Sequence, residues 1–147
     1  MSILETKLSE HFILSDLVPK DIVMEDLEYS IRYIDQRVLD ALEQVVKFFG
    51  VKPIVNNYAS GGSLSYRGFR PPSYDDGAKN SMHRYGKAAD ISIPGKTDSS
   101  VRRTILDNRV KFPDIRRMEE NTTGWVHIDV KVTGQNGIVM FPNPNFK

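Results

Sequence analysis

The chain has 147 residues, of which 39% are hydrophobic and 27% are charged, and its formal net charge is +1. This length and composition are typical of one globular domain, whereas the nearly neutral charge argues against nucleic acid or an anionic membrane surface as a partner. The chain has no cysteine, which excludes disulfide bridges and thiolate metal sites, so any metal ligands must be His, Asp or Glu.

We expect residues 1–147 to form a single domain, in which residues 1–30 are a segment docked on the rest. The N-terminus has no basic stretch followed by an apolar one, so no signal peptide is predicted. No run of about 18 apolar residues occurs, so no membrane insertion is expected. These features together predict a protein that is made in the cytoplasm.

The middle of the chain is predicted to alternate between helices, strands and one long loop. The expected elements are a helix over 31–49, a buried strand over 51–59, a surface loop over 60–80, a strand over 87–93 and a helix over 98–112. Gly50 is a natural end for the first helix, and Pro94 ends the second strand. Asp98 or Ser99 is the expected N-cap of the second helix.

The C-terminal third is predicted to be β-structure. Residues 114–120 and 124–132 flank the sequence "NTTG", which is typical of a hairpin turn, and residues 138–142 form a last short strand. The expected fold class is therefore α+β, with helices packed on a small, mainly antiparallel sheet.

One short stretch, "SMHRYGKAAD", contains His83 and, seven residues later, Asp90. A third residue of matching chemistry, His127, lies in the middle of the predicted strand "GWVHIDV". Two neutral imidazoles and one carboxylate form a three-ligand zinc set with a fourth position open for water, and zinc lowers the pKa of such a water to roughly 7. His11 has no partner in the sequence and is predicted to be a surface or packing residue.

The stretch "SMHRYGKAAD" resembles the Ser-x-His-x-x-Gly-x-Ala-x-Asp signature of the zinc D-Ala-D-Ala carboxypeptidase / L-Ala-D-Glu endopeptidase family, whose fold is shared with the hedgehog N-terminal domain. "GWVHID" resembles the second motif of that family, and "HFILSDLV" resembles the N-terminal segment of many phage-encoded and bacterial members. The resemblance implies that His83, Asp90 and His127 are zinc ligands. It also implies that the substrate is a peptidoglycan stem peptide.

The family often carries an Arg in a Ser-Gly-Tyr-Arg turn, where it binds the carboxylate of the substrate. The corresponding stretch here, "SYRGFRPP", offers two candidates, Arg67 after a Tyr and Arg70 before two prolines. Either guanidinium suits bidentate recognition of a carboxylate. Ser81, beside the first predicted ligand, is expected to bond the substrate or to orient a ligand.

The family motif does not assign a general base in this chain. Many family members carry an Asp or Glu three residues before the last His ligand, but this position is Gly124 here. If "NTTG" is a four-residue turn, Glu120 faces the same side of the hairpin as His127. Asp129 shares that side because it lies two residues further along the same strand. Glu120 is therefore the first candidate and Asp129 the second, and a shift of one residue in the turn exchanges Glu120 for Glu119.

The leading hypothesis is a zinc metallopeptidase that hydrolyses peptidoglycan stem peptides, as a D-Ala-D-Ala carboxypeptidase or an L-Ala-D-Glu endopeptidase. It would act on the bacterial cell wall as a phage lysin or a virion-associated enzyme. The alternative is a structural or assembly protein of a virion, in a tail or capsid, with other virion proteins as partners and little or no peptidase activity. The glycine at position 124 favours this alternative.

Overall fold

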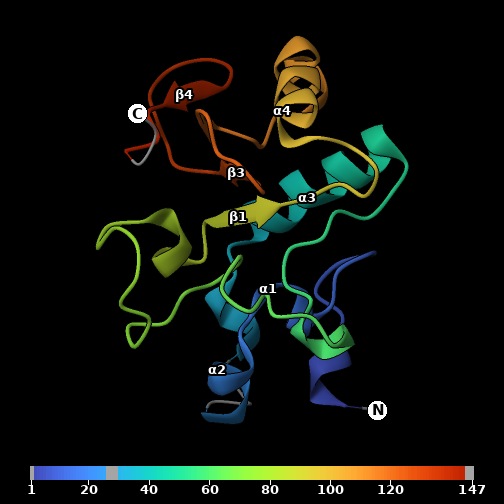
Figure 1. The fold of residues 1–147 in the computed structure, drawn as a ribbon, viewed down its shortest axis with the longest axis vertical. Coiled ribbons are helices and arrows are strands. Elements are labelled where there is room, and N and C mark those ends of the chain that lie inside the picture. Colours follow the sequence, from blue (N-terminus) through green and yellow to red (C-terminus); the bar gives the residue numbers. More distant parts are fainter. Residues whose placement is uncertain (1, 26–29, 145–147) are drawn as a thin grey trace.

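The computed structural model describes residues 2–25 and 30–144 and shows an α+β fold (Figure 1). Its regular elements are the helices α1 (Leu14–Leu17), α2 (Lys20–Glu25), α3 (Gln36–Phe49) and α4 (Asp98–Asp107), and the strands β1 (Ala88–Ile91), β2 (Arg117–Glu119), β3 (Val126–Asp129) and β4 (Val139–Phe141). Among these residues, no helix is both long and apolar enough to cross a membrane.

Helix α3 confirms the strongest periodic pattern of the sequence, but it begins five residues later than predicted, because residues 30–33 form a 3-10 turn. Asp35 caps its N-terminus by accepting a hydrogen bond from the backbone N–H of Arg37. At the other end Gly50 has a φ of 71°, which glycine adopts without a steric penalty. One face of the helix, including Leu42 and Val45, is buried in the hydrophobic core.

The prediction of a strand over 51–59 is wrong, because the structure has only an isolated bridge between Ile54 and Ser92 there. The two asparagines that follow bond to a loop instead of a strand. Asn56 accepts a hydrogen bond from the backbone N–H of Arg67, and Asn57 accepts one from the backbone N–H of Leu64. Asparagine side chains compete in this way with regular ladders, so the chain leaves the sheet and enters the long loop.

In the described part of the chain the sheet has four strands in the order β1-β3-β2-β4. Strand β3 pairs antiparallel with both β1 and β2, but β4 pairs parallel with β2. The sheet is therefore mainly antiparallel, as predicted, but it is mixed because the pairing at the β4 edge is parallel. The reason is that the chain crosses from β3 past β2 to the far edge, instead of returning in a hairpin.

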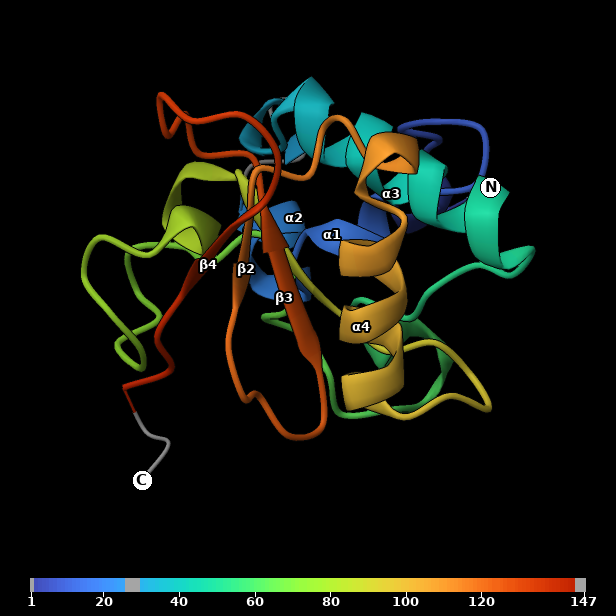
Figure 2. The ribbon, with the colours of Figure 1, turned by 90° about the horizontal axis from the view of Figure 1, so that it is seen from above.

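The two faces of the sheet differ sharply in chemistry. Ala89, Ile91, Met118, Val126 and Ile128 point to one face and belong to the hydrophobic core, together with residues of α3 and α4. Figures 1 and 2 show these two helices on one side of the strands and the segment just before β1 on the other. Since side chains alternate along a strand, the second face carries the polar residues of β1, β2 and β3.

The register of the β2–β3 hairpin differs by one residue from the prediction. A four-residue turn would place Met118 opposite His127, but Met118 pairs with Ile128. Continuing this ladder by one residue puts Glu119 opposite His127. Glu119, not Glu120, is therefore on the polar face, and the predicted orientation of Glu120 toward His127 is wrong.

The loop between β2 and β3, which is longer than the predicted four-residue turn, is hydrogen-bonded to α4. Arg102 donates hydrogen bonds to the carbonyl oxygen and to the hydroxyl of Thr122, at 3.0 and 2.6 Å. Asp98, one of the two predicted caps of α4, instead accepts a hydrogen bond from the backbone N–H of Gly124. The cap itself is Thr97. These long-range bonds accompany the shifted register, and the turn sequence does not reveal them.

Candidate metal centre and substrate cleft

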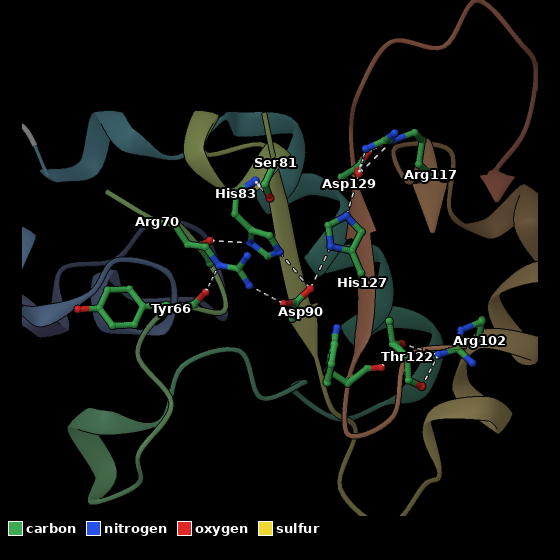
Figure 3. A network of polar contacts seen from close by, with 12 residues as sticks. Tyr66, Arg70, Ser81, His83, Asp90, Arg102, Arg117, Thr122, His127 and Asp129 are labelled. Atoms are coloured by element: carbon green, nitrogen blue, oxygen red, sulfur yellow. Dashed lines mark hydrogen bonds and ion pairs between the residues drawn. The ribbon is translucent and has the colours of Figure 1, made fainter. Parts of the chain in front are cut away.

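Three buried polar side chains meet on the polar face of the sheet (Figure 3). His83 comes from a 3-10 turn, Met82–Tyr85, that precedes β1, while Asp90 in β1 and His127 in β3 are direct partners in the ladder. One possible ligand atom from each lies within 4.8 Å of the other two. The structure thus brings together the three residues that the sequence predicts as metal ligands.

The turn that carries His83 is shaped by its two ends. Ser81 caps it by accepting a hydrogen bond from the backbone N–H of His83. Gly86 ends it with a φ of 67°, and a Cβ added there would lie 1.6 Å from the carbonyl oxygen of Tyr33. The serine and glycine of the motif therefore place the histidine. Ser81 is predicted to orient a ligand or to bond the substrate, and its contact with His83 supports the orienting role.

Hydrogen bonds orient both imidazole rings. His83 Nδ1 donates to the carbonyl oxygen of Gly68 at 2.8 Å, which leaves Nε2 facing Asp90 Oδ1 at 3.1 Å. His127 Nε2 bonds Asp129 Oδ2 at 2.8 Å, and its Nδ1 lies 3.0 Å from the same oxygen of Asp90. A partner on one ring nitrogen determines which nitrogen is available to a metal. The available nitrogens are His83 Nε2 and His127 Nδ1.

The charges of the cluster fit a cation. Burial lowers the pKa of His83, so its ring is neutral and its Nε2 presents a lone pair to a carboxylate oxygen. For His127 burial also opposes the charged form, but its hydrogen bonds to the carboxylates of Asp129 and Asp90 outweigh burial and raise the pKa to about 9. Burial likewise opposes ionisation of Asp90, yet the two histidines hold its pKa below the usual range. A divalent cation among these atoms would displace the proton that His127 carries, compensate two buried carboxylates and accept a lone pair from each ring.

Asp129, the second candidate for the general base, lies at the opposite edge of the His127 ring from Asp90 (Figure 3). Its side chain is fully buried and is bound by Arg117 through Nε at 3.0 Å and Nη2 at 2.8 Å. Arg117 itself lies over the ring of Phe141, 4.2 Å from its centroid. This geometry supports an orienting role for Asp129, since its oxygens are bound on the far side of the ring.

Replacing Arg117 by alanine is expected to weaken zinc binding about tenfold to a hundredfold, the usual effect of losing a partner behind a metal ligand. Without Arg117, Asp129 holds the His127 ring less firmly. Competition with a chromophoric chelator would measure the zinc affinity. Arg116→Ala is the matched control, because Arg116 donates to the carbonyl of Gln135 instead of contacting the cluster. Equal zinc affinities of the two variants would contradict the expected role.

A hollow of about 310 Å³ opens beside Asp90. Its walls are Ser63, Leu64, Ser65, Tyr66, Arg67, Arg70, Tyr74, Asp90 and Trp125. Both arginines of the stretch "SYRGFRPP" therefore line one cleft that reaches the candidate metal centre. A second hollow of about 350 Å³, lined by residues such as Val110 and Ile138, contains none of the candidate ligands.

The two arginines of the cleft have different partners. Arg70 donates to Asp90 Oδ2 at 3.1 Å and to the Tyr66 carbonyl at 2.8 Å, so part of its charge is balanced by the cluster itself. Arg67 donates to the Ser92 hydroxyl and the Gly124 carbonyl, both at 3.0 Å, and both of these partners are neutral. Arg67 is thus held firmly and retains its charge for an anionic group in the cleft.

Glu119 lies on the polar face, whereas the sequence analysis named it only as the alternative to Glu120 for the general base. It is half-buried, and burial together with Asp90 raises the pKa of its carboxyl, against the pull of His127 and Arg70. The signal for it in the sequence was the sensitivity of the hairpin to a shift of one residue. Nothing in the sequence indicated the roles of Arg117 or of the Gly68 carbonyl.

His11 is an exposed surface residue, as predicted, and it has a partner that the sequence did not indicate. Its Nδ1 lies 2.6 Å from Glu43 Oε1, and Ser9 donates to the other oxygen of Glu43. With Glu10 these residues form a second cluster of metal-ligand types, but His11 and Glu10 are exposed. The cluster joins the N-terminal segment to α3.

A buried His-Asp-His cluster beside an arginine-lined cleft defines a candidate mononuclear metal centre of the hydrolytic type. A family model, Peptidase M15, matches residues 16–129, a range that contains the whole cluster and both arginines. The chain belongs to the peptidase M15 family, and this membership supports a metallopeptidase of the peptidoglycan-acting kind. Comparison with curated proteins and with solved structures found no match.

Proposed function

We propose that this protein is a zinc metallopeptidase that hydrolyses a peptide bond in peptidoglycan stem peptides. The observation that carries the proposal is that His83 Nε2 and His127 Nδ1 both face one oxygen of Asp90, while the other nitrogen of each ring is bonded to an acceptor. This is the arrangement of a metal site whose ligands are already oriented.

His83, Asp90 and His127 would hold the zinc ion. An ion bound by three protein ligands in this way lowers the pKa of a water molecule at its open position to roughly 7 and polarises a carbonyl group. The protein keeps the ligands in place through the Gly68 carbonyl and Asp129, and Arg70 binds the second oxygen of Asp90. Imidazole and carboxylate ligands without cysteine are typical of catalytic zinc rather than structural zinc.

The cleft beside Asp90 would bind the stem peptide. Arg67 is the candidate for a substrate carboxylate, since its two hydrogen bonds hold the guanidinium in place without neutralising it. Tyr66 and Trp125 form aromatic walls of the same cleft. A terminal carboxylate in this position would make the enzyme a carboxypeptidase, and a side-chain or internal carboxylate would make it an endopeptidase.

Zinc-loaded protein is expected to cut purified peptidoglycan, with new amino and carboxyl termini detected by mass spectrometry and lost after chelation. Arg67→Ala is expected to raise KM about tenfold to a hundredfold, the effect of losing a charge-assisted hydrogen bond. Arg84→Ala is the control, because Arg84 bonds only carbonyls of the loop over 76–78 among the described residues. An unchanged KM for Arg67→Ala would remove this residue from the substrate site.

The second candidate function is a virion structural or assembly protein that keeps the metal but does little or no hydrolysis. The specific observation in its favour is that position 124, three residues before His127, is a glycine and has no carboxylate. The same assay separates the two functions. Zinc-loaded protein that cuts no bond in cell walls of several chemotypes would favour the structural role.

A further inference from the structure

The metal centre needs a carboxylate that can take a proton from the attacking water, and the strand that carries His127 does not supply one. Gly124 has no side chain, and its carbonyl accepts a hydrogen bond from Arg67. Asp129 is bound by Arg117 behind the His127 ring. A general base must therefore come from a neighbouring strand.

We infer that Glu119 of β2 is the general base of this hydrolysis, an inference that rests on the proposed zinc peptidase function. Neighbouring strands align one row of residues across the polar face. Asp90 pairs with His127, the β2–β3 ladder continues to Glu119 opposite His127, and Glu119 pairs with Phe141 of β4. Direct cross-strand partners on one face have Cβ atoms about 5 Å apart, so Glu119 is the carboxylate next to the cluster in this row.

Glu119 is also available for proton transfer. Its carboxylate has no hydrogen bond or ion pair with any residue that the structure describes, although the side chain is half-buried. Asp90 contacts His83, His127 and Arg70, and Asp129 contacts His127 and Arg117, so these two carboxylates are fully engaged. The Glu119 oxygens are not among the buried side-chain atoms that lack a partner in the described residues, so they reach solvent and can take a proton from water.

Phe141 closes the outer end of the row. Its ring packs edge-on against His127, with the centroids 5.4 Å apart, and it lies beneath the guanidinium of Arg117. Phe141 is the direct partner of Glu119 in the β2–β4 ladder, so it continues the row beyond that residue. Glu120 is the first residue after β2, in the turn, and continuing the alternation of the strand by one residue turns it to the opposite face.

The proton transfers balance as a simple hydrolysis. The Glu119 carboxylate takes a proton from water as the water oxygen bonds to the carbonyl carbon of the scissile peptide. The same proton passes to the amide nitrogen as the carbon–nitrogen bond breaks. The products are a carboxylic acid and an amine, and Glu119 returns to its ionised form.

Glu119→Gln and Glu120→Gln form a matched pair of neighbouring residues, one at the end of β2 on the polar face and one in the turn that follows. In the zinc-loaded full-length protein, Glu119→Gln is expected to lower kcat by about a hundredfold to ten-thousandfold, with KM, zinc content and the circular dichroism spectrum unchanged. Glu120→Gln is expected to retain the kcat of the wild type. Glu119→Asp, which keeps a carboxylate on a shorter side chain, should recover part of the lost rate.

Three outcomes would overturn the assignment. Glu119→Gln with the kcat of the wild type would show that Glu119 is not the base, while the zinc peptidase function stands. Loss of zinc from Glu119→Gln, with Glu119→Asp also zinc-free, would make the residue structural. No turnover by the zinc-loaded wild type would reject the proposed function and the base together.

Discussion

Replacing His127 by alanine is expected to reduce bound zinc from about one equivalent per chain to almost none. The variant would leave two protein ligands, His83 and Asp90, and the cluster would lose the nitrogen that faces Asp90 at 3.0 Å. Peptidase activity should disappear with the metal. Elemental analysis of the purified protein, after zinc is supplied and excess metal is removed, measures this directly.

The chain supplies its own control for this experiment. His11 is the only other histidine besides the two of the cluster, and it lies in the exposed group with Glu10 and Glu43. His11→Ala is expected to keep the full zinc content. If His11→Ala loses the metal and His127→Ala keeps it, the metal is bound by the group around His11 and not by the buried cluster, and the proposed mechanism fails.

Gly86→Ala is expected to lower the free energy of unfolding by more than about 3 kcal/mol, or to prevent folding. A φ of 67° costs an alanine about 1–2 kcal/mol. The larger effect is steric, since the new Cβ would lie 1.6 Å from the Tyr33 carbonyl oxygen. The backbone at Gly86 would have to move away from the segment around Tyr33. This movement would also break the hydrogen bond that the Gly86 carbonyl accepts from the Asp35 N–H at 2.9 Å. Urea denaturation of the purified protein would measure the change.

Gly95→Ala is the control for backbone strain alone. Gly95 has a similar φ of 79°, but a Cβ added there would meet no atom within 4 Å. This variant should cost only about 1–2 kcal/mol. Equal losses in the two variants would mean that the contact between the His83 turn and the segment before α3 has no energetic importance.

The close approach of Gly86 to the Tyr33 carbonyl should also affect zinc binding. The Gly86 N–H donates to the His83 carbonyl, so displacement of Gly86 also displaces the histidine. A Gly86→Ala protein that folds is therefore expected to bind zinc more weakly, whereas Gly95→Ala should bind it normally. The glycine of the motif thus connects the stability of the fold with the geometry of the metal centre.

The sequence by itself determined the parts of this protein that depend on local chemistry. The spacing of apolar residues predicted the main helix, the order of the predicted elements indicated an α+β fold, and the absence of cysteine excluded thiolate chemistry. Asp90 lies seven positions after His83, and a short turn followed by a strand brings their side chains together. Motif resemblance pointed to the family that the comparison supports at the level of peptidase M15.

Only the tertiary structure decided which carboxylates and arginines lie around the cluster. Strand register is decisive because a shift of one residue turns every side chain to the other face, and here it exchanged Glu120 for Glu119. Bonds from Arg102 and Asp98 to the hairpin loop accompany this register, and they join residues 20 and 26 positions apart in the chain. Local sequence patterns do not contain such long-range contacts, so the pairing of Arg117 with Asp129 and the parallel fourth strand could be seen only once the chain was folded.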